Sequence, residues 1–149
     1  MKTSFYKNNL LAAALILGVS QTGLVSAHDQ IGSLLGSASA GATDLYQISC
    51  GVDSAKLIAQ LDDQGPSGPI MSLQIFKGAK AVTTTDTVGG DGAYSPLVSL
   101  TPPVGSGAGA YTVLVNHTGL AAESYAFIYH CESAAGAHTA TGIVRLQNQ

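Results

Sequence analysis

Apolar and polar residues alternate with period two in short runs from Asp44 to the end of the chain. The runs are rich in β-branched and aromatic residues, and clusters of Gly, Pro, Asp and Ser separate them, which is typical of strands joined by turns. No segment after residue 27 repeats apolar residues at helical spacing. The predicted strands are residues 44–50, 56–62, 70–77, 81–85, 94–100, 110–117, 124–131 and 138–146.

This pattern predicts an all-β fold, a single antiparallel β-sandwich that is jelly-roll-like and has about eight strands. Successive side chains of a strand point to opposite faces, so the alternation also predicts which residues fill the interior. Those residues are Tyr46, Ile48, Cys50, Leu57, Ala59, Leu61, Leu73, Ile75, Tyr111, Val113, Val115, Tyr125, Phe127, Tyr129 and Cys131. Proline cannot donate to a strand ladder, so Pro96 predicts that the run 94–100 is an edge or bulged strand.

Residues 1–27 have the pattern of a cleaved signal peptide. Lys2 and Lys7 precede an apolar run at 10–19, and Val25 and Ala27 occupy the two positions that signal peptidase recognises. A membrane anchor is the alternative, but the apolar run is too short to span about 30 Å of hydrocarbon. We therefore expect a secreted or periplasmic protein with no membrane span in its mature form, beginning at His28.

Residues 28–43 form a Gly-, Ser- and Ala-rich arm before the sandwich domain, which is expected to cover residues 44–149. Only Ile31, Leu34 and Leu35 are bulky, so the arm buries too little apolar surface to order itself. It is either mobile or held by docking these residues. Docking onto a sheet edge of a second copy would make residues 28–43 a route to homo-association.

The two cysteines, Cys50 and Cys131, both lie after residue 27. An even pair in an exported chain normally closes into a disulfide, because the compartment is oxidising. Free thiols acting as metal ligands are the weaker alternative, since neither cysteine belongs to a CxxC pair. The sequence predicts a Cys50–Cys131 disulfide that joins two core-facing positions.

The order of the runs resembles the bacterial pre-peptidase C-terminal type of secreted β-sandwich. The segments that carry the resemblance are DLYQISC, KLIAQLDD, MSLQIFKG, YSPLVSL, GAYTVLVNH and ESYAFIYHC, between Asp44 and Cys131. The resemblance implies a non-catalytic accessory module that in some members binds matrix or calcium. This chain departs from the family in standing without an enzyme, in its cysteine pair and in lacking a rich cluster of acidic ligands, which puts an inherited binding activity in doubt.

Histidines are the first candidates for chemistry. A mature N-terminal His28 would offer its α-amine and one ring nitrogen to Cu(II), and a second histidine would complete a three-nitrogen histidine brace. The candidates for that second ligand are His117, His130 and His138. Alternatively, His130 and His138 bind a metal with each other across a hairpin, or all of these are ordinary surface histidines.

Aspartates are the next candidates, for Ca²⁺. Asp62 and Asp63 share one loop, and Asp86 and Asp91 flank a Gly-Gly pair, so their oxygens could serve a cation that needs six to eight oxygen ligands. The chain has no D-x-D-x-D-G loop, and solvated turn aspartates are the alternative interpretation. We carry Asp62, Asp63 and Asp91 forward as the candidate calcium ligands.

Charge and motif content exclude other classes of function. After residue 27 the chain has four Lys and Arg residues against nine Asp and Glu residues, so its surface is acidic and unsuited to nucleic acid. It has no HExxH or Cys/His zinc spacing, no nucleophile elbow and no opposed carboxylate pair, so no enzyme activity is expected. The sequence predicts a secreted, non-enzymatic binding or structural module, with an exported copper-binding protein as the alternative.

Overall fold

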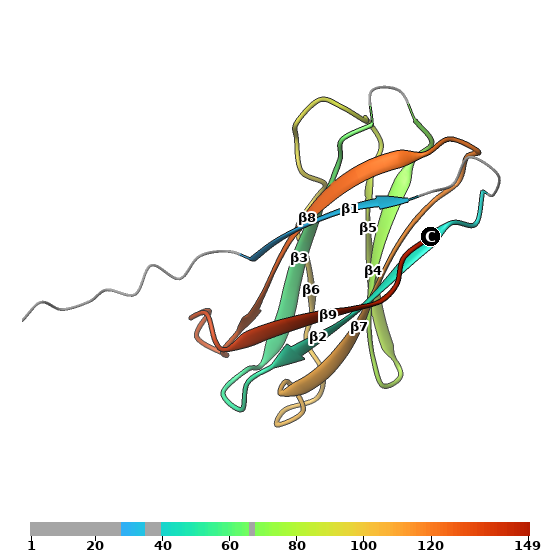
Figure 1. The fold of residues 1–149 in the computed structure, drawn as a ribbon. Helices are drawn as coiled ribbons and strands as arrows, with labels where there is room; N and C mark the ends of the chain where they lie inside the picture. Colours follow the sequence, from blue (N-terminus) through green and yellow to red (C-terminus); the bar gives the residue numbers. More distant parts are fainter. Residues whose placement is uncertain (1–27, 35–39, 66–67) are drawn as a thin grey trace, which may run out of the picture.

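The computed structural model describes residues 28–34, 40–65 and 68–149, and these form nine strands without a helix. The strands pack as two antiparallel sheets of a sandwich, which confirms the predicted fold class (Figure 1). The strands are β1 His28–Leu34, β2 Thr43–Cys50, β3 Lys56–Asp63, β4 Met71–Lys77, β5 Lys80–Asp86, β6 Val98–Leu100, β7 Gly109–His117, β8 Glu123–Glu132 and β9 Thr141–Gln147.

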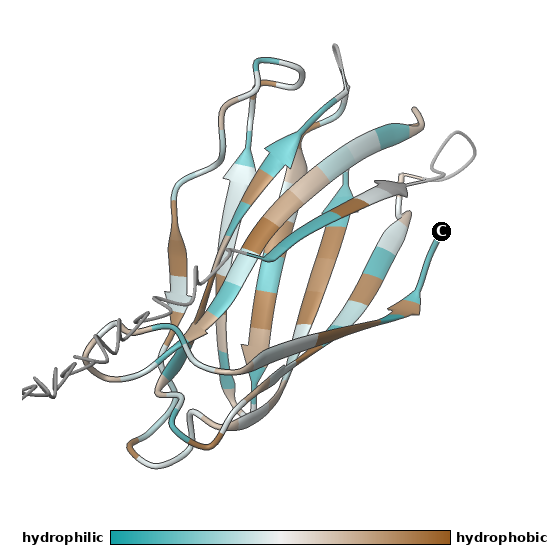
Figure 2. Ribbon diagram, turned by 60° about the vertical axis from the view of Figure 1, so that its left-hand side comes forward, coloured by the Kyte–Doolittle hydropathy of each residue, from teal (hydrophilic) through white to brown (hydrophobic). Residues whose placement is uncertain are grey.

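The smaller sheet has the strand order β1-β8-β3-β6, and the larger sheet has the order β5-β4-β7-β2-β9. Side chains alternate along these strands, so apolar and polar bands follow one another in Figure 2. All the interior positions predicted from the alternation are buried. Tyr46, Ile48, Tyr125 and Phe127 are among those that show no exposed surface, and Tyr46 meets Phe127 edge-on with ring centroids 5.1 Å apart.

The disulfide joins the two layers. Cys50 ends β2 in the larger sheet and Cys131 lies near the end of β8 in the smaller one, with their Cα atoms 5.5 Å apart. The predicted pairing is therefore confirmed. Because Cys131 stands between His130 and Glu132, the bond anchors the strand segment that carries these two polar side chains.

Two segments differ most in extent from the strands expected, and the run 138–146 also forms a strand only from Thr141 onward, β9. Only Val98–Leu100 of the run 94–100 forms a strand, β6, which lies at a sheet edge as Pro96 led us to expect. Residues 28–34 of the Gly- and Ser-rich arm form β1, an edge strand that the alternation did not reveal. The expected signal peptide, residues 1–27, lies outside the described residues. In the part that the structure describes, no helix is long and apolar enough to cross a membrane.

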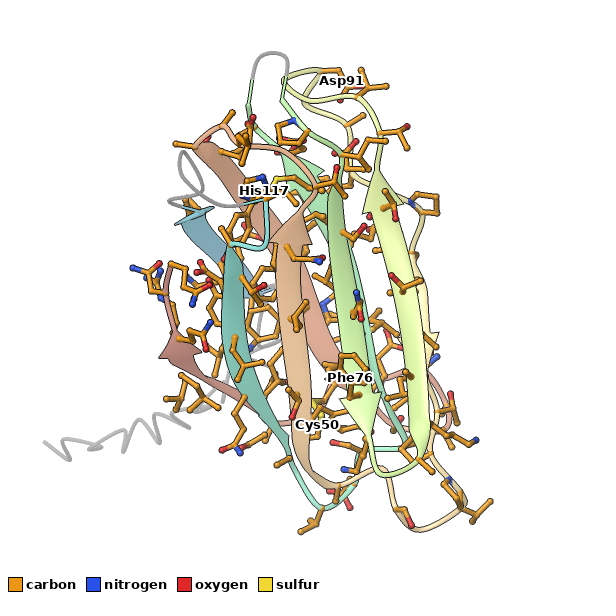
Figure 3. The ribbon with its side chains drawn as sticks, turned by 90° about the vertical axis from the view of Figure 1, so that its right-hand side faces the viewer. Cys50, Phe76, Asp91 and His117 are labelled. Carbon is orange, nitrogen blue, oxygen red and sulfur yellow. A yellow bond between two sulfur atoms is a disulfide. The ribbon has the colours of Figure 1, made fainter. Side chains whose placement is uncertain are left out.

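The long axis of the sandwich separates two groups of polar residues. β8 runs from Glu123 at one end to Glu132 at the other, antiparallel to β3. Figure 3 shows His117 and Asp91 toward one end and Cys50 and Phe76 toward the other. His130 lies at the cysteine end, so it is far along the sandwich from His117.

Candidate metal centre

A short hairpin at the cysteine end places Glu132 directly opposite His138. Thr139 N–H donates to Cys131 O at 2.9 Å and Ser133 N–H donates to Ala137 O at 2.8 Å, and these bonds flank the Glu132–His138 bridge. In such a non-hydrogen-bonded pair the two side chains project from the same face of the hairpin and lie close together. Gly136, with a φ of 81°, makes the turn that closes the hairpin.

His130 joins this pair because it lies two residues before Glu132 on the same face of β8. Its ring stacks on the His138 ring with centroids 4.2 Å apart and planes inclined by 27°. One ligand atom from each of His130, Glu132 and His138 lies within 4.8 Å of the other two. We name these three half-buried residues the outer-face cluster.

Both histidines of the outer-face cluster have a ring nitrogen without a partner. Nδ1 of His130 and Nδ1 of His138 are buried, and neither makes a hydrogen bond in the part of the chain that the structure describes. Burial lowers the pKa of His130 and the neighbouring His138 charge lowers it further, while Glu132 acts in the opposite direction. His130 is therefore neutral at pH 7, which is the form that binds a metal.

The Glu132 carboxylate faces two different partners. Its Oε2 atom pairs with Lys56 Nζ at 2.9 Å, and its Oε1 atom lies 3.8 Å from His130 Nε2. Lys56 is in register opposite Glu132 on β3. One carboxylate oxygen is thus directed at the histidines, while the ammonium group of Lys56 holds the other and competes with any cation for the carboxylate.

His28 lies beside the outer-face cluster rather than within it. It is the first residue of β1 and is opposite Tyr129, whose ring it stacks against with centroids 5.5 Å apart. Tyr129 faces the interior, so the His28 ring is directed away from the face that carries His130. Its charge is nevertheless among the causes that lower the pKa of His130, so the two residues are electrostatic neighbours.

The other predicted metal ligands lie elsewhere. His117 is buried at the opposite end of the sandwich. Asp62 and Asp63 are successive residues of β3 and point to opposite faces, since Asp62 pairs with Ala126 and Asp63 with Tyr125. Asp91 is exposed in the loop between β5 and β6 and accepts a hydrogen bond from Ala93 N–H. The structure does not bring the three candidate calcium ligands together.

Sequence reasoning missed Glu132 and Lys56. The motif His-x-Glu at 130–132 could have been recognised from the sequence, because residues two apart on a strand share a face. The hairpin register that brings His138 opposite Glu132 depends on the turn at 133–137, and the Lys56 contact depends on how β3 and β8 pair. Neither register follows from the local sequence.

A hollow of about 460 Å³ adjoins the outer-face cluster. Lys56 and Ser133 lie on its wall together with Pro102, Pro103 and Val104 of the loop before β7. Lys56 is the one charged residue among those that line it. A small molecule in this hollow would therefore meet the ammonium group that pairs with Glu132.

Comparison with known proteins adds no family. No protein-family model matches the chain, and no curated protein matches it. The resemblance to the pre-peptidase C-terminal type of module stays a prediction, and the argument for function depends on the geometry of the candidate site.

Proposed function

We propose that this protein is an exported, non-enzymatic β-sandwich module that binds one transition-metal ion, Cu(II) in preference, through His130, His138 and Glu132. The observation that carries the proposal is the outer-face cluster itself, with three ligand atoms within 4.8 Å of one another. Two ligands that share a metal at about 2.0–2.2 Å each are separated by up to about 4 Å. A small rearrangement of the side chains is then enough to close the site.

The ligand types favour copper among the common metals. Two imidazoles and one carboxylate form a nitrogen-rich set that suits Cu(II) or Zn²⁺ rather than Ca²⁺ or Mg²⁺, and Cu(II) binds most tightly to a given site of this kind. The two imidazole Nδ1 atoms that lack partners would gain one through the metal. The ion pair between Lys56 and Glu132 would break, or Lys56 would pair with the carboxylate oxygen that does not bind the metal.

The mature N-terminus supplies a further ligand in this proposal. Once residues 1–27 are removed, the α-amine of His28 stands at the start of β1, on the strand next to the Tyr129–His130 link. Neighbouring strands are about 4.8 Å apart, so the amine is within reach of a metal held by His130. The His28 ring would bind the metal only if it moved away from Tyr129. The α-amine without the ring supplies a fourth ligand to the metal.

Export to the periplasm or beyond the cell is part of the proposal. The signal-peptide pattern of residues 1–27 supports it, and the Cys50–Cys131 bond is compatible with an oxidising compartment. We infer a module that carries or sequesters metal outside the cytoplasm, because two imidazoles and a carboxylate grouped on one face suit the retention of an ion.

Calorimetric titration of the exported and processed protein with Cu(II) tests the proposal. We expect one ion per chain, and a loss of affinity of at least a hundredfold in the variant His130→Ala/His138→Ala. Asp91→Asn is the control, because it removes an exposed charge at the far end of the sandwich. Equal affinity in the double variant and in the control would refute the proposed site.

Self-association by strand exchange is a second candidate, favoured by the position of β1. This strand lies at the edge of the smaller sheet and pairs only with β8 in the described part of the chain. Such an edge strand can leave its own sheet and pair with β8 of a second copy instead. The test compares the molecular mass in solution of the mature protein with that of a variant lacking residues 28–43, over a range of concentrations. If both proteins are monomers, self-association is refuted.

A further inference from the structure

Four ionisable side chains turn inward at the end of the sandwich opposite the outer-face cluster. Asp63 and His117 are 1% exposed, Glu123 is 5% exposed and Asp86 is 6% exposed. Asp63 is in register opposite Tyr125, which is fully buried, and Glu123 lies two residues before Tyr125 on the same face of β8. The two carboxylates of the smaller sheet therefore face the larger sheet.

The larger sheet contributes the other two groups in one row. Met71 of β4 pairs with Asp86 of β5 on one side and with His117 of β7 on the other, and Met71 has no exposed surface. All three side chains consequently point toward the smaller sheet. Figure 3 shows His117 at this end of the sandwich. We name Asp63, Asp86, His117 and Glu123 the interior cluster.

The members of the interior cluster differ in how far their hydrogen bonds are satisfied. Asp86 accepts from Asp63 N–H at 2.8 Å and from Val88 N–H at 3.1 Å, so its two oxygens are occupied. Asp63 Oδ1 accepts from Gly65 N–H at 3.0 Å.

The remaining atoms of the interior cluster are left without partners. Oε2 of Glu123 and both ring nitrogens of His117 are buried and make no hydrogen bond in the described part of the chain. Buried polar atoms are almost always paired, so three orphaned atoms in one cluster indicate a missing partner.

The charges of the interior cluster are equally uncompensated. Among the described residues, the ion pairs formed by lysine and arginine involve Glu132 and Asp44 and none of these carboxylates. Burial raises the pKa of Asp63 to about 6, with the charges of Glu123 and Asp86 adding to the effect. Burial also raises the pKa of Glu123.

His117 has the opposite response. Burial lowers its pKa, while the charge of Asp63 acts to raise it, so the imidazole is neutral at pH 7. A neutral imidazole is a metal ligand, and a cation is the partner that would compensate the buried carboxylates.

Two glycines lie close to the Glu123 carboxylate. A Cβ atom at Gly65 would lie 1.5 Å from Glu123 Oε2, and one at Gly68 would lie 1.6 Å from Oε1. The backbone at Gly65 and Gly68 therefore passes close to the Glu123 carboxylate. A Cβ at Gly89 would lie 2.3 Å from Gly65 O and 3.2 Å from Asp63 Oδ2, so a backbone carbonyl oxygen stands near the free oxygen of Asp63.

From this geometry we propose that Asp63, Glu123 and His117 bind a divalent transition-metal ion of the class that accepts mixed carboxylate and imidazole ligands, represented by Zn²⁺ and Mn²⁺. Asp86 is a positioning residue, since its carboxylate fixes the backbone N–H of Asp63. Among the described residues, the ligand atoms of this cluster do not all lie within 4.8 Å of one another, so binding requires the three side chains to move closer together. The site is separate from the outer-face cluster and does not depend on it.

The test uses the exported, processed protein carrying His130→Ala and His138→Ala, which leaves the interior cluster intact. Thermal unfolding is followed by circular dichroism at pH 7 with EDTA, Zn²⁺, Mn²⁺ or Ca²⁺. We expect Zn²⁺ and Mn²⁺ to raise the Tm by about 10 °C at an ion concentration a hundredfold above Kd, and Ca²⁺ to have a smaller effect. Electron paramagnetic resonance of Mn²⁺ is expected to count one bound ion per chain.

Glu123→Gln and His117→Asn, made in the same background, are expected to abolish both the Tm shift and the bound Mn²⁺ signal. Asp91→Asn, which removes an exposed carboxylate at the same end, is expected to leave both unchanged. Circular dichroism with EDTA shows whether each variant is folded before metal is added. The absence of a shift with Zn²⁺ and Mn²⁺, a response to Ca²⁺ alone, or equal binding in Glu123→Gln and its parent would each overturn the site.

Discussion

Glu132 and His138 face each other as a directly opposed pair at the corner where the chain leaves the smaller sheet. His130 stacks on His138, and the Cys50–Cys131 bond holds the strand between the two β8 residues of the cluster. A local hairpin and a long-range covalent bond thus both constrain the outer-face cluster, the proposed metal site. The predictions below follow from this arrangement.

Removing Lys56 should strengthen metal binding at the outer-face cluster. Lys56 holds Glu132 Oε2 at 2.9 Å, and the metal must compete with that ion pair. We expect Lys56→Gln to raise Cu(II) affinity about threefold, the size of a partly exposed ion pair. Titration calorimetry measures the change. Glu132→Gln is expected to act in the opposite direction, and a gain of affinity in that variant would show that the carboxylate is not a ligand.

One residue added before His28 should weaken Cu(II) binding without abolishing it. The extension turns the α-amine into an amide but leaves His130 and His138 in place. We expect about a tenfold loss, measured by competition with a Cu(II) chelator at pH 7, as for the loss of one good ligand among four. An extension by the same residue at the C-terminus is the control. Unchanged affinity would remove His28 from the site and leave the outer-face cluster as its only source of ligands.

Removing the disulfide should cost both stability and metal affinity. The two cysteines are 81 residues apart, so the chain-entropy model gives about 4 kcal/mol for Cys50→Ala/Cys131→Ala. Urea unfolding measures this loss. Cu(II) titration of the folded variant is expected to show weaker binding, because the strand between His130 and Glu132 loses its anchor. A variant with unchanged Cu(II) affinity would show that the hairpin alone positions the ligands.

The fold was predictable because one face of nearly every strand is buried. Tyr46 and Ile48, for example, alternate with the polar Gln47 and Ser49, and period two then fixes both strand type and face. The segment 28–34 escaped prediction because Gly32 and Ser33 interrupt the apolar pattern and an edge strand buries little. Its order comes from backbone pairing with β8, which leaves no signature in side-chain hydropathy.

Stability should fall steeply at alkaline pH. Burial raises the pKa of the core tyrosines Tyr46, Tyr111, Tyr125 and Tyr129 above 10. Above pH 10 the unfolded chain therefore loses phenolic protons that the folded chain keeps. Each tyrosine then lowers the free energy of unfolding by up to about 1.4 kcal/mol per pH unit.

Urea unfolding between pH 8 and pH 11.5 measures this slope. We expect little change below pH 9.5 and a decline that begins near pH 10. Tyr125→Phe removes one group and should make the decline shallower, although it also removes the hydrogen bond that Tyr125 donates to Asp44 at 2.6 Å. A flat profile up to pH 11 would contradict the assignment of these phenols to a dry interior.

Part of each candidate site was visible in the sequence. The sequence offered His130 and His138 as one candidate metal pair across a hairpin and Asp63 as one candidate calcium ligand, beside the alternatives of surface histidines and solvated aspartates. Alternation could have separated Asp62 from Asp63, because neighbours on a strand point to opposite faces. The placement of Asp63, Glu123 and His117 at one end of the interior could not be predicted, since it requires the pairing of β3 with β8 and the packing of two sheets.

Pulsed electron paramagnetic resonance of the processed protein, loaded with one equivalent of Cu(II), tests the central claim most directly. The modulation pattern counts the imidazoles bound to copper through their remote nitrogens. We predict two imidazoles in the unaltered protein and one in His138→Ala, with the spectrum of Asp91→Asn unchanged. A copper ion without imidazole ligands, or a pattern that survives His130→Ala/His138→Ala unaltered, would contradict the metal centre proposed for this protein.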